Sequence, residues 1–162
     1  MAAALGADLE TPELAAAKAA YEDRAAEFAR VAAEKADLTS LFIYADEANE
    51  YVAYPPLWAD LAMYQALGLN IIVPEAPPGD YWEELSPELA LKYPSDIVFQ
   101  STRAGVLTLE ELAAHPTYGK LPAVAAGQAG PWNQDFIQSY QGLAAAFDML
   151  LATLRGAEDV TA

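Results

Sequence analysis

Residues 93–105 read YPSDIVFQSTRAG and combine a turn, an apolar run and a loop. Pro94 and Asp96 favour the turn, and the unbroken run Ile97–Phe99 predicts a strand buried on both faces. Such strands occur in parallel sheets that are covered by helices on both sides. Arg103 follows the run, at the end of the strand where open parallel sheets bind ligands. The chain has only eight basic residues, so the position of this arginine suggests a role in binding.

Short apolar runs and helical segments alternate on both sides of this stretch. Strands are predicted at 41–44, 70–73, 96–100 and 127–132, and helices at 55–67, 87–92, from 109 onward and at 135–154. The alternation predicts an α/β fold, a three-layer lobe whose central sheet is mostly parallel, has about four strands and carries helices on both faces.

A long helix is predicted before this lobe. Thr11 is a good N-cap, Pro12 suits the first helical position, and the segment up to Lys35 is rich in Ala and lacks Gly and Pro. About 24 residues at about 1.5 Å each make a helix of roughly 36 Å, which is long for a compact half-domain. We therefore divide the chain into residues 1–36, an N-terminal segment with the long helix, and 37–162, the α/β lobe.

The composition narrows the function. Of 162 residues, 24 are acidic and eight basic, so the formal net charge is -16. This charge argues against nucleic acid and anionic lipid as partners, and it fits a cationic ligand or a basic partner surface. The absence of cysteine excludes disulfides and thiolate chemistry. The start, MAAALGADLETPE, lacks the pattern of a signal peptide, which indicates either a cytoplasmic chain or one whose true N-terminus has been removed.

Catalytic motifs are missing from the sequence. It contains no phosphate-binding glycine loop and no serine elbow. The single histidine, His115, precedes a proline and is interpreted as an ordinary helix-end residue, so we predict no metal site. The carboxylate pairs at 46–47 and 83–84 are interpreted as solvated, because sequence neighbours usually point apart. The chain is therefore not expected to be an enzyme.

Aromatic residues gather at the predicted carboxyl ends of the strands. These segments hold Arg103 together with Tyr51, Tyr54, Tyr81, Trp82 and Trp132. One arginine among aromatic rings is more typical of a recognition surface than of a catalytic centre.

Three stretches carry a resemblance to a known family: LGLNIIVP (67–74), WEELSPELALKYPSDIVF (82–99) and TLEELAAHPTYGKLPAVAAGQ (108–128). In this order and spacing, from about Leu14 to the end, the chain resembles the C-terminal lobe of the substrate-binding proteins of iron-siderophore ABC importers, the class with a rigid interdomain helix. In that family two α/β lobes enclose the ligand and one long helix joins them.

The resemblance implies that the helix at 12–35 is the connector and that the N-terminal lobe, with any signal peptide or lipoprotein anchor, is absent from this chain. The implied function is capture of a ferric siderophore and its delivery to a membrane permease, in the periplasm or at the cell surface. The siderophore, not the protein, holds the iron, so no cofactor is bound directly. An exposed half-cleft also predicts self-association of the isolated lobe.

Family roles transfer to five positions. Arg103 matches a siderophore-contacting position, although a solvated loop arginine is the simpler interpretation. Tyr51 and Trp132 are expected to line the pocket wall, and Trp82 is expected to be half core and half ligand contact at the start of a helix. Glu88 matches the glutamate that pairs with an arginine of the permease; it also suits the first turn of its own helix.

Two alternatives remain open. One is a stand-alone cytoplasmic α/β protein, either a small enzyme or an interaction module. The other is the same receptor frame binding haem or a corrinoid instead of a siderophore.

Overall fold

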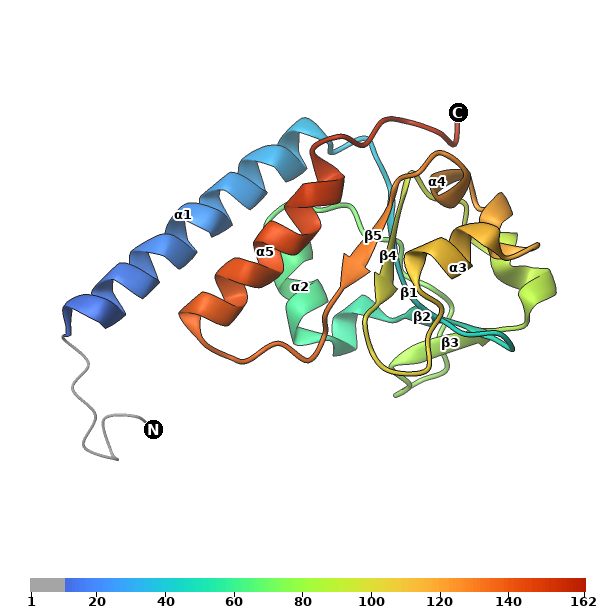
Figure 1. Cartoon of the computed structure of the whole chain (residues 1–162), viewed down its shortest axis with the longest axis horizontal. Coiled ribbons are helices and arrows are strands. Elements are labelled where there is room, and N and C mark those ends of the chain that lie inside the picture. Colours follow the sequence, from blue (N-terminus) through green and yellow to red (C-terminus); the bar gives the residue numbers. More distant parts are fainter. Residues whose placement is uncertain (1–10) are drawn as a thin grey trace.

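A computed structural model describes residues 11–162 and has an α/β fold built on one five-stranded sheet (Figure 1). The strands are β1 (Ser40–Ala45), β2 (Glu50–Ala53), β3 (Trp82–Leu85), β4 (Ile97–Ser101) and β5 (Ala129–Trp132), in the order β3-β2-β1-β4-β5. The expected fold class and three of the expected strands, β1, β4 and β5, are confirmed. Residues 1–10, which begin the expected N-terminal segment, lie outside the described residues.

The sheet is mixed, which corrects the prediction of about four mostly parallel strands. β1 pairs with β4 and β4 with β5 in parallel, whereas β2 runs antiparallel to both β1 and β3. β2 follows β1 through a turn in which the Asp46 carboxylate accepts hydrogen bonds from the backbone N–H groups of Ala48 and Asn49. So short a connection allows only antiparallel pairing, because a parallel return needs about a dozen residues or more.

The strand expected at 70–73 is also wrong. This segment makes one parallel bridge, between Ile71 and Ser40. The reason is the neighbouring hairpin, since β2 occupies the same edge of β1 from Ile43 to Ala45. Only residues 40–42 of β1 lie outside the pairing with β2, the segment bridges the first of them, and Val73 is left 49 % exposed.

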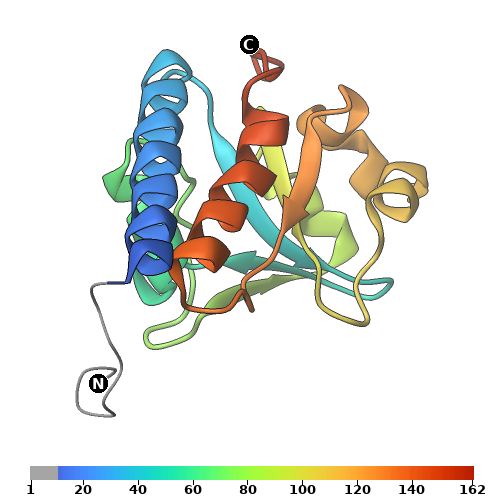
Figure 2. The ribbon, with the colours of Figure 1, turned by 60° about the vertical axis from the view of Figure 1, so that its left-hand side comes forward.

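The long helix is confirmed as α1 (Pro12–Glu34), 23 residues capped by the Thr11 hydroxyl, which accepts from the backbone N–H of Leu14 at 3.2 Å. Its buried residues, Phe28, Val31 and Ala32, all belong to its second half. The first turns of α1 extend beyond the sheet, and its later turns run beside α5 (Tyr140–Leu154) (Figures 1 and 2). Within residues 11–162, every helix is too short or too polar to cross a membrane.

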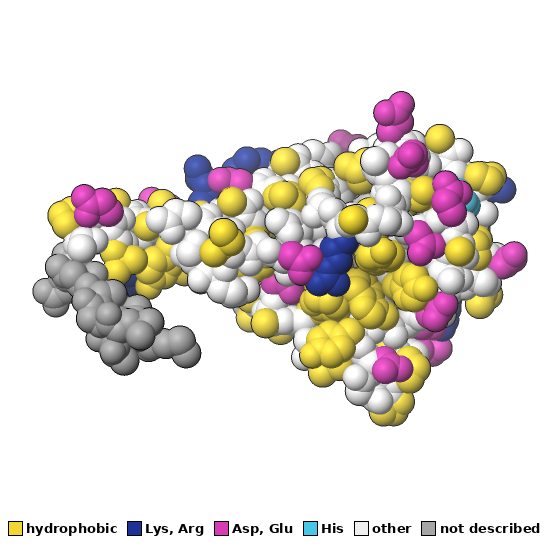
Figure 3. All heavy atoms as spheres, turned by 60° about the horizontal axis from the view of Figure 1, so that its bottom comes forward, with side chains coloured by type: hydrophobic (Ala, Val, Ile, Leu, Met, Phe, Trp, Pro, Cys, Tyr) yellow, Lys and Arg dark blue, Asp and Glu magenta, His cyan; other side chains and the backbone are white. Residues whose placement is uncertain are grey.

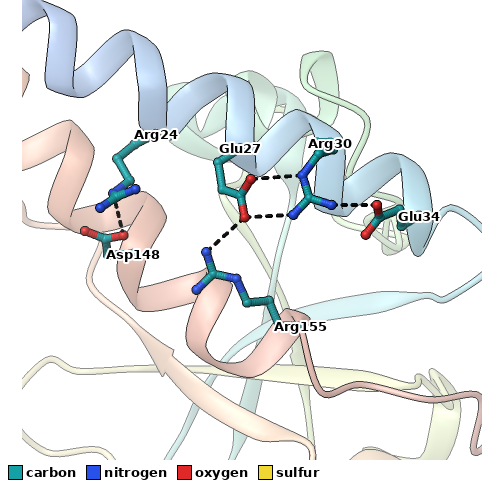
Figure 4. Close-up of polar contacts among 6 residues, drawn as sticks. All are labelled: Arg24, Glu27, Arg30, Glu34, Asp148 and Arg155. Carbon is teal, nitrogen blue, oxygen red and sulfur yellow. Dashed lines mark hydrogen bonds and ion pairs between the residues drawn. The ribbon is translucent and has the colours of Figure 1, made fainter.

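Apolar rings and ion pairs join α1 to α5. The ring of Phe147 on α5 lies 5.1 Å from that of Phe28 on α1. At the surface, Arg24 pairs with Asp148 at 2.9 Å (Figure 4). Glu27 accepts from Arg30 on its own helix and from Arg155, which follows α5, at 2.8 and 3.0 Å (Figure 4). The long helix is therefore fixed to the lobe along its second half.

Two apolar clusters lie on the two faces of the sheet, as expected for a three-layer lobe. One contains Phe42 and Phe99 and is covered by α1, α5 and α2 (Ala59–Ala66). The other contains Ile43 and Val98 and is covered by shorter elements. These are the 3-10 turns η3 (Pro87–Lys92) and η4 (Tyr118–Lys120) and the helices α3 (Leu109–Ala114) and α4 (Pro122–Ala125).

Candidate functional site

Four aromatic residues form a continuous surface on the sheet face that α1, α2 and α5 cover. Phe42 of β1 is buried under these helices, and Tyr44, two residues further, lies on the same face but is partly exposed. Tyr51 of β2 is the cross-strand partner of Tyr44. Trp82 of β3 and Trp58, which precedes α2, complete the set. We call Tyr44, Tyr51, Trp58 and Trp82 the aromatic platform.

The rings of the platform are in mutual contact. Centroids are 5.0 Å apart for Trp58 and Trp82, and 5.7 Å apart for Tyr44 and Tyr51. Trp82 also lies 6.2 Å from Tyr44 and 6.5 Å from Tyr51. These edge-to-face arrangements are the ones that aromatic pairs favour. Figure 3 shows hydrophobic side chains gathered on this side of the molecule around a basic and an acidic group.

Two hollows flank the platform. The larger, about 860 Å³, is lined by Tyr51, Trp58, Glu75, Pro77, Asp80, Tyr81, Trp82, Glu83 and Glu84. The smaller, about 290 Å³, is lined by Tyr44, Asp46, Tyr51, Trp82 and Arg103. Tyr51 and Trp82 border both hollows, so the sheet places two of the sequence-predicted residues at the centre of the site.

Trp82 reaches this position from a strand, not from the start of a helix as predicted. It pairs with Ala53 of β2, and Tyr51, two residues away on β2, faces the same side. The prediction that Trp82 is part core and part surface agrees with its intermediate exposure.

Trp58 was not foreseen, because a single helix was expected across 55–67. The backbone of Trp58 is extended (φ -103°, ψ 114°) and separates the 3-10 turn Pro55–Leu57 from α2. Its indole N–H donates to the carbonyl of Tyr81 at 3.0 Å, and the Tyr81 ring packs against it at 5.3 Å. The two prolines before it were the one local signal for this break in the helix.

Arg103 lies at the edge of the platform, in the loop after β4. Its guanidinium carbon is 5.8 Å from the centroid of the Trp58 ring, within the range of a cation–π contact. Its Nε and Nη2 donate to the two carboxylate oxygens of Asp135, each at 2.6 Å. This bidentate pair lowers the pKa of Asp135 and raises that of Arg103. The arginine therefore borders the site with its charge already balanced.

Trp132 supports the platform from below and does not line a hollow. Its side chain is 1 % exposed, which corrects the expectation that it forms the pocket wall. The indole N–H donates to Oδ2 of Asp60 on α2 at 2.8 Å, which holds the ring inside the lobe. The Trp132 centroid lies 5.5 Å from that of Trp58 and 6.0 Å from that of Trp82. All three tryptophans of the chain thus form one cluster.

Glu88 lies elsewhere, on η3, which packs over the other apolar cluster through Ala90. Its side chain is exposed, and its neighbours Leu89 and Leu91 are 54 % and 51 % exposed. A carboxylate beside exposed leucines is a surface that a partner protein can contact.

His115 lies outside this site, at the end of α3. Its Nδ1 accepts from the backbone N–H groups of Thr117 and Tyr118, each at 3.3 Å, and its ring stacks on that of Tyr118 at 4.3 Å. Such contacts fit the interpretation of His115 as a helix-end residue. Among residues 11–162, no three His, Asp or Glu side chains are grouped so that they could hold a metal ion.

Comparison with known proteins places this geometry in a family. The family model for periplasmic binding proteins matches residues 1–132. Among solved structures, the chain is similar to DesE, a ferric-siderophore receptor protein from Streptomyces coelicolor, with a TM-score of 0.88 and 31 % identity over 98 % of this chain and 54 % of that one. No curated protein matches.

Two further structures share the fold. The siderophore periplasmic binding protein from the fuscachelin gene cluster of Thermobifida fusca has a TM-score of 0.71 and 21 % identity, over 90 % of this chain and 55 % of that one. FhuD2 from Staphylococcus aureus with bound ferrioxamine B has a TM-score of 0.60 and 19 % identity, over 88 % of this chain and 58 % of that one.

The chain therefore spans little more than half the length of the solved structures it matches. In a family whose ligand lies between two lobes, this length corresponds to a single lobe. With a family model that matches most of its residues, the chain belongs to the periplasmic binding proteins, a family of substrate-binding proteins.

Proposed function

We propose that this chain is the C-terminal ligand-binding lobe of an ABC importer's substrate-binding protein, and that it binds a ferric siderophore and delivers it to the membrane permease. The observation that carries the proposal is the aromatic platform, with its two hollows, on the face of the sheet near the carboxyl ends of β1 and β4. The likeness to a ferric-siderophore receptor at 31 % identity supports the choice of ligand.

The platform suits a bulky ligand that presents both apolar and polar surface. Ring faces of Trp58 and Trp82 offer apolar area, and the tyrosine hydroxyls and Arg103 offer hydrogen bonds at the rim. The siderophore itself surrounds the iron, so the protein needs no metal ligands of its own. The function is binding without catalysis, in the periplasm or at the cell surface.

The remaining sequence-predicted residues receive matching roles in this proposal. Tyr51, Trp82 and Arg103 contact the ligand, and Trp132 holds the two surface tryptophans in place. Glu88, on another surface of the lobe, contacts the permease. A second lobe would close over the platform, as in the two-lobed family.

Nuclear magnetic resonance provides a test that also detects weak binding. Gallium(III) has the charge of iron(III) and is diamagnetic, so the gallium complex of ferrioxamine B is a suitable probe. We expect it to shift the indole N–H signals of Trp58 and Trp82 in the 162-residue chain, with a smaller effect on the buried Trp132. If neither surface indole shifts at millimolar probe, the proposed ligand class fails for this chain.

Haem and a corrinoid serve as competing ligands in the same experiment. Haem is flat and presents large apolar faces, so it tests whether the platform selects for aromatic stacking alone; a corrinoid, which carries amide side chains and axial ligands, tests a bulkier macrocycle. Stronger perturbation by either compound than by the gallium siderophore would assign the receptor to that ligand instead.

A further inference from the structure

The two hollows beside the aromatic platform have an uneven balance of charge. Arg103 is the only basic side chain among the residues that line them, whereas the acidic ones are Asp46, Glu75, Asp80, Glu83 and Glu84. Lys92 contacts two of these carboxylates, Glu75 and Glu83, from beside the larger hollow. Most of the negative charge therefore lacks a matching cation.

Three of the carboxylates have no ion-pair partner among residues 11–162. Asp46 accepts two backbone N–H groups of its turn, and Glu84 lies 3.5 Å from the Tyr51 hydroxyl. Asp80 is exposed on the rim of the larger hollow. A ligand on the platform thus meets carboxylates on the β2–β3 side that no lysine or arginine neutralises.

On the opposite side, Asp135 neutralises the one arginine. Two hydrogen bonds of 2.6 Å occupy the Nε and Nη2 donors of Arg103. An anionic group on a ligand must displace the Asp135 carboxylate or lie next to it, and both options cost free energy. A cationic group meets the faces of the platform rings and the unpaired carboxylates, both of which attract it.

We infer that Asp135 sets the charge preference of this site, so that the lobe binds a cationic ferric complex in preference to an anionic one. The inference rests on the proposed function and goes beyond it by assigning the charge class of the ligand and the residue that determines it. Arg103 and Asp135 then form a neutral ion pair at the edge of the platform, and Arg103 does not act as an anion receptor.

Three complexes of one chelator can test this inference. Ferrioxamine B carries a free amine and is cationic, its N-acetyl derivative is neutral, and its N-succinyl derivative is anionic, while the iron environment stays the same. We expect affinity to fall in that order, by about tenfold for each unit of charge at low ionic strength, and by less at high salt.

Asp135→Asn is the decisive variant, because it frees the charge of Arg103. It should weaken binding of the cationic complex and strengthen that of the anionic one, which narrows the ratio of the two affinities by about tenfold. Arg103→Gln should act in the opposite direction and widen the ratio. Thermal unfolding of each variant establishes that it is folded before its affinities are compared.

The chain offers a matched control in Asp148→Asn. Asp148 also pairs with an arginine, Arg24, at similar exposure, but it lies on α5 and lines neither hollow (Figure 4). This variant changes the net charge by the same amount and should leave the affinity ratio unchanged. Equal shifts in the Asp135→Asn and Asp148→Asn variants would attribute the effect to overall charge and overturn the inference.

The failures of the two proposals are distinguishable. If none of the three complexes binds, the proposed function falls and this inference falls with it. If all three bind equally well, or the anionic complex binds most tightly, the lobe remains a siderophore receptor and only the assignment of Asp135 is wrong.

Discussion

The indole N–H of Trp132 donates to Oδ2 of Asp60 at 2.8 Å, in the interior of the lobe and across 72 residues of sequence. This bond joins β5 to α2 directly beneath the two surface tryptophans. Burial raises the pKa of Asp60, while the hydrogen bond from Trp132 works against that shift. The carboxyl group thus serves mainly as the hydrogen-bond acceptor that holds the Trp132 ring against Trp58 and Trp82.

Removal of this acceptor should destabilise the lobe. Asp60→Ala leaves the buried indole N–H without a partner, which costs about 1–3 kcal/mol in the free energy of unfolding. Urea unfolding followed by tryptophan fluorescence measures this cost. Asp60→Asn keeps an acceptor oxygen of the same shape and serves as the control. Equal loss in the two variants would show that charge, and not the hydrogen bond, matters here.

Trp82 should contribute to ligand binding through its ring. Trp82→Ala removes one of the two residues that both hollows share, and we expect affinity for ferrioxamine B to fall by roughly tenfold or more. Trp82→Phe keeps an aromatic face and should retain most of the affinity. Isothermal titration calorimetry provides the comparison, and wild-type affinity in a folded Trp82→Ala variant would remove Trp82 from the site.

Local signals in the sequence were enough to predict α1, β4 and α3. Thr11 caps the long helix, and Thr108 and Glu111 form the capping box that opens α3. The unbroken apolar run Ile97–Phe99 predicted a buried strand, and β4 is buried at every position. In each of these elements the deciding contacts lie within a few residues of one another.

The two antiparallel strands β2 and β3 were missed because they look polar. β2 and β3, with sequences EYVA and WEEL, contain three glutamates in eight residues, and a glutamate seldom marks a buried strand. The Arg103–Asp135 pair was missed for a different reason, since its partners are 32 residues apart and meet only after β4 and β5 have paired. The position of Arg103 was predictable, but the neutralisation of its charge was not.

Glu50, the first residue of β2, should make the stability of the fold depend on pH. Its side chain is 0 % exposed, neither of its carboxylate oxygens has a hydrogen-bond partner among the described residues, and burial raises its pKa to about 8. In the unfolded chain the carboxyl group titrates near its ordinary value of 4.5. Between these two values the native state holds a proton that the unfolded state has lost, so stability falls as pH rises.

Chemical denaturation between pH 5 and pH 8 tests this dependence. We expect the free energy of unfolding of the wild type to fall by about 3 kcal/mol or more over this range. Glu50→Gln cannot ionise and should flatten the curve, whereas Glu47→Gln, on the exposed turn next to it, should not. The hydrogen-bonded Asp96, whose pKa is about 2 despite its burial, titrates below this range and does not contribute. A pH slope that survives in Glu50→Gln would assign the effect to another group.

Glu88 should affect delivery of the ligand to the permease and not the binding of the ligand by the lobe. It is exposed on η3, and the residues that line the two hollows do not include it. Glu88→Ala should therefore leave the affinity for ferrioxamine B unchanged and lower its uptake through the cognate permease reconstituted in vesicles. Loss of the carboxylate removes a charge that an arginine of the permease can pair with.

Glu110→Ala is the matched control for this experiment. Glu110 is likewise an exposed glutamate in the first turn of a short helix, here α3, so its loss has the same effect on charge and on the helix terminus. Uptake should be normal in this variant. Because Leu89 and Leu91 are exposed on the same 3-10 turn as Glu88, replacement of either by Ser should also reduce uptake while binding remains intact. Normal uptake in Glu88→Ala, or an equal defect in Glu110→Ala, would mean that the permease contacts another surface of the lobe.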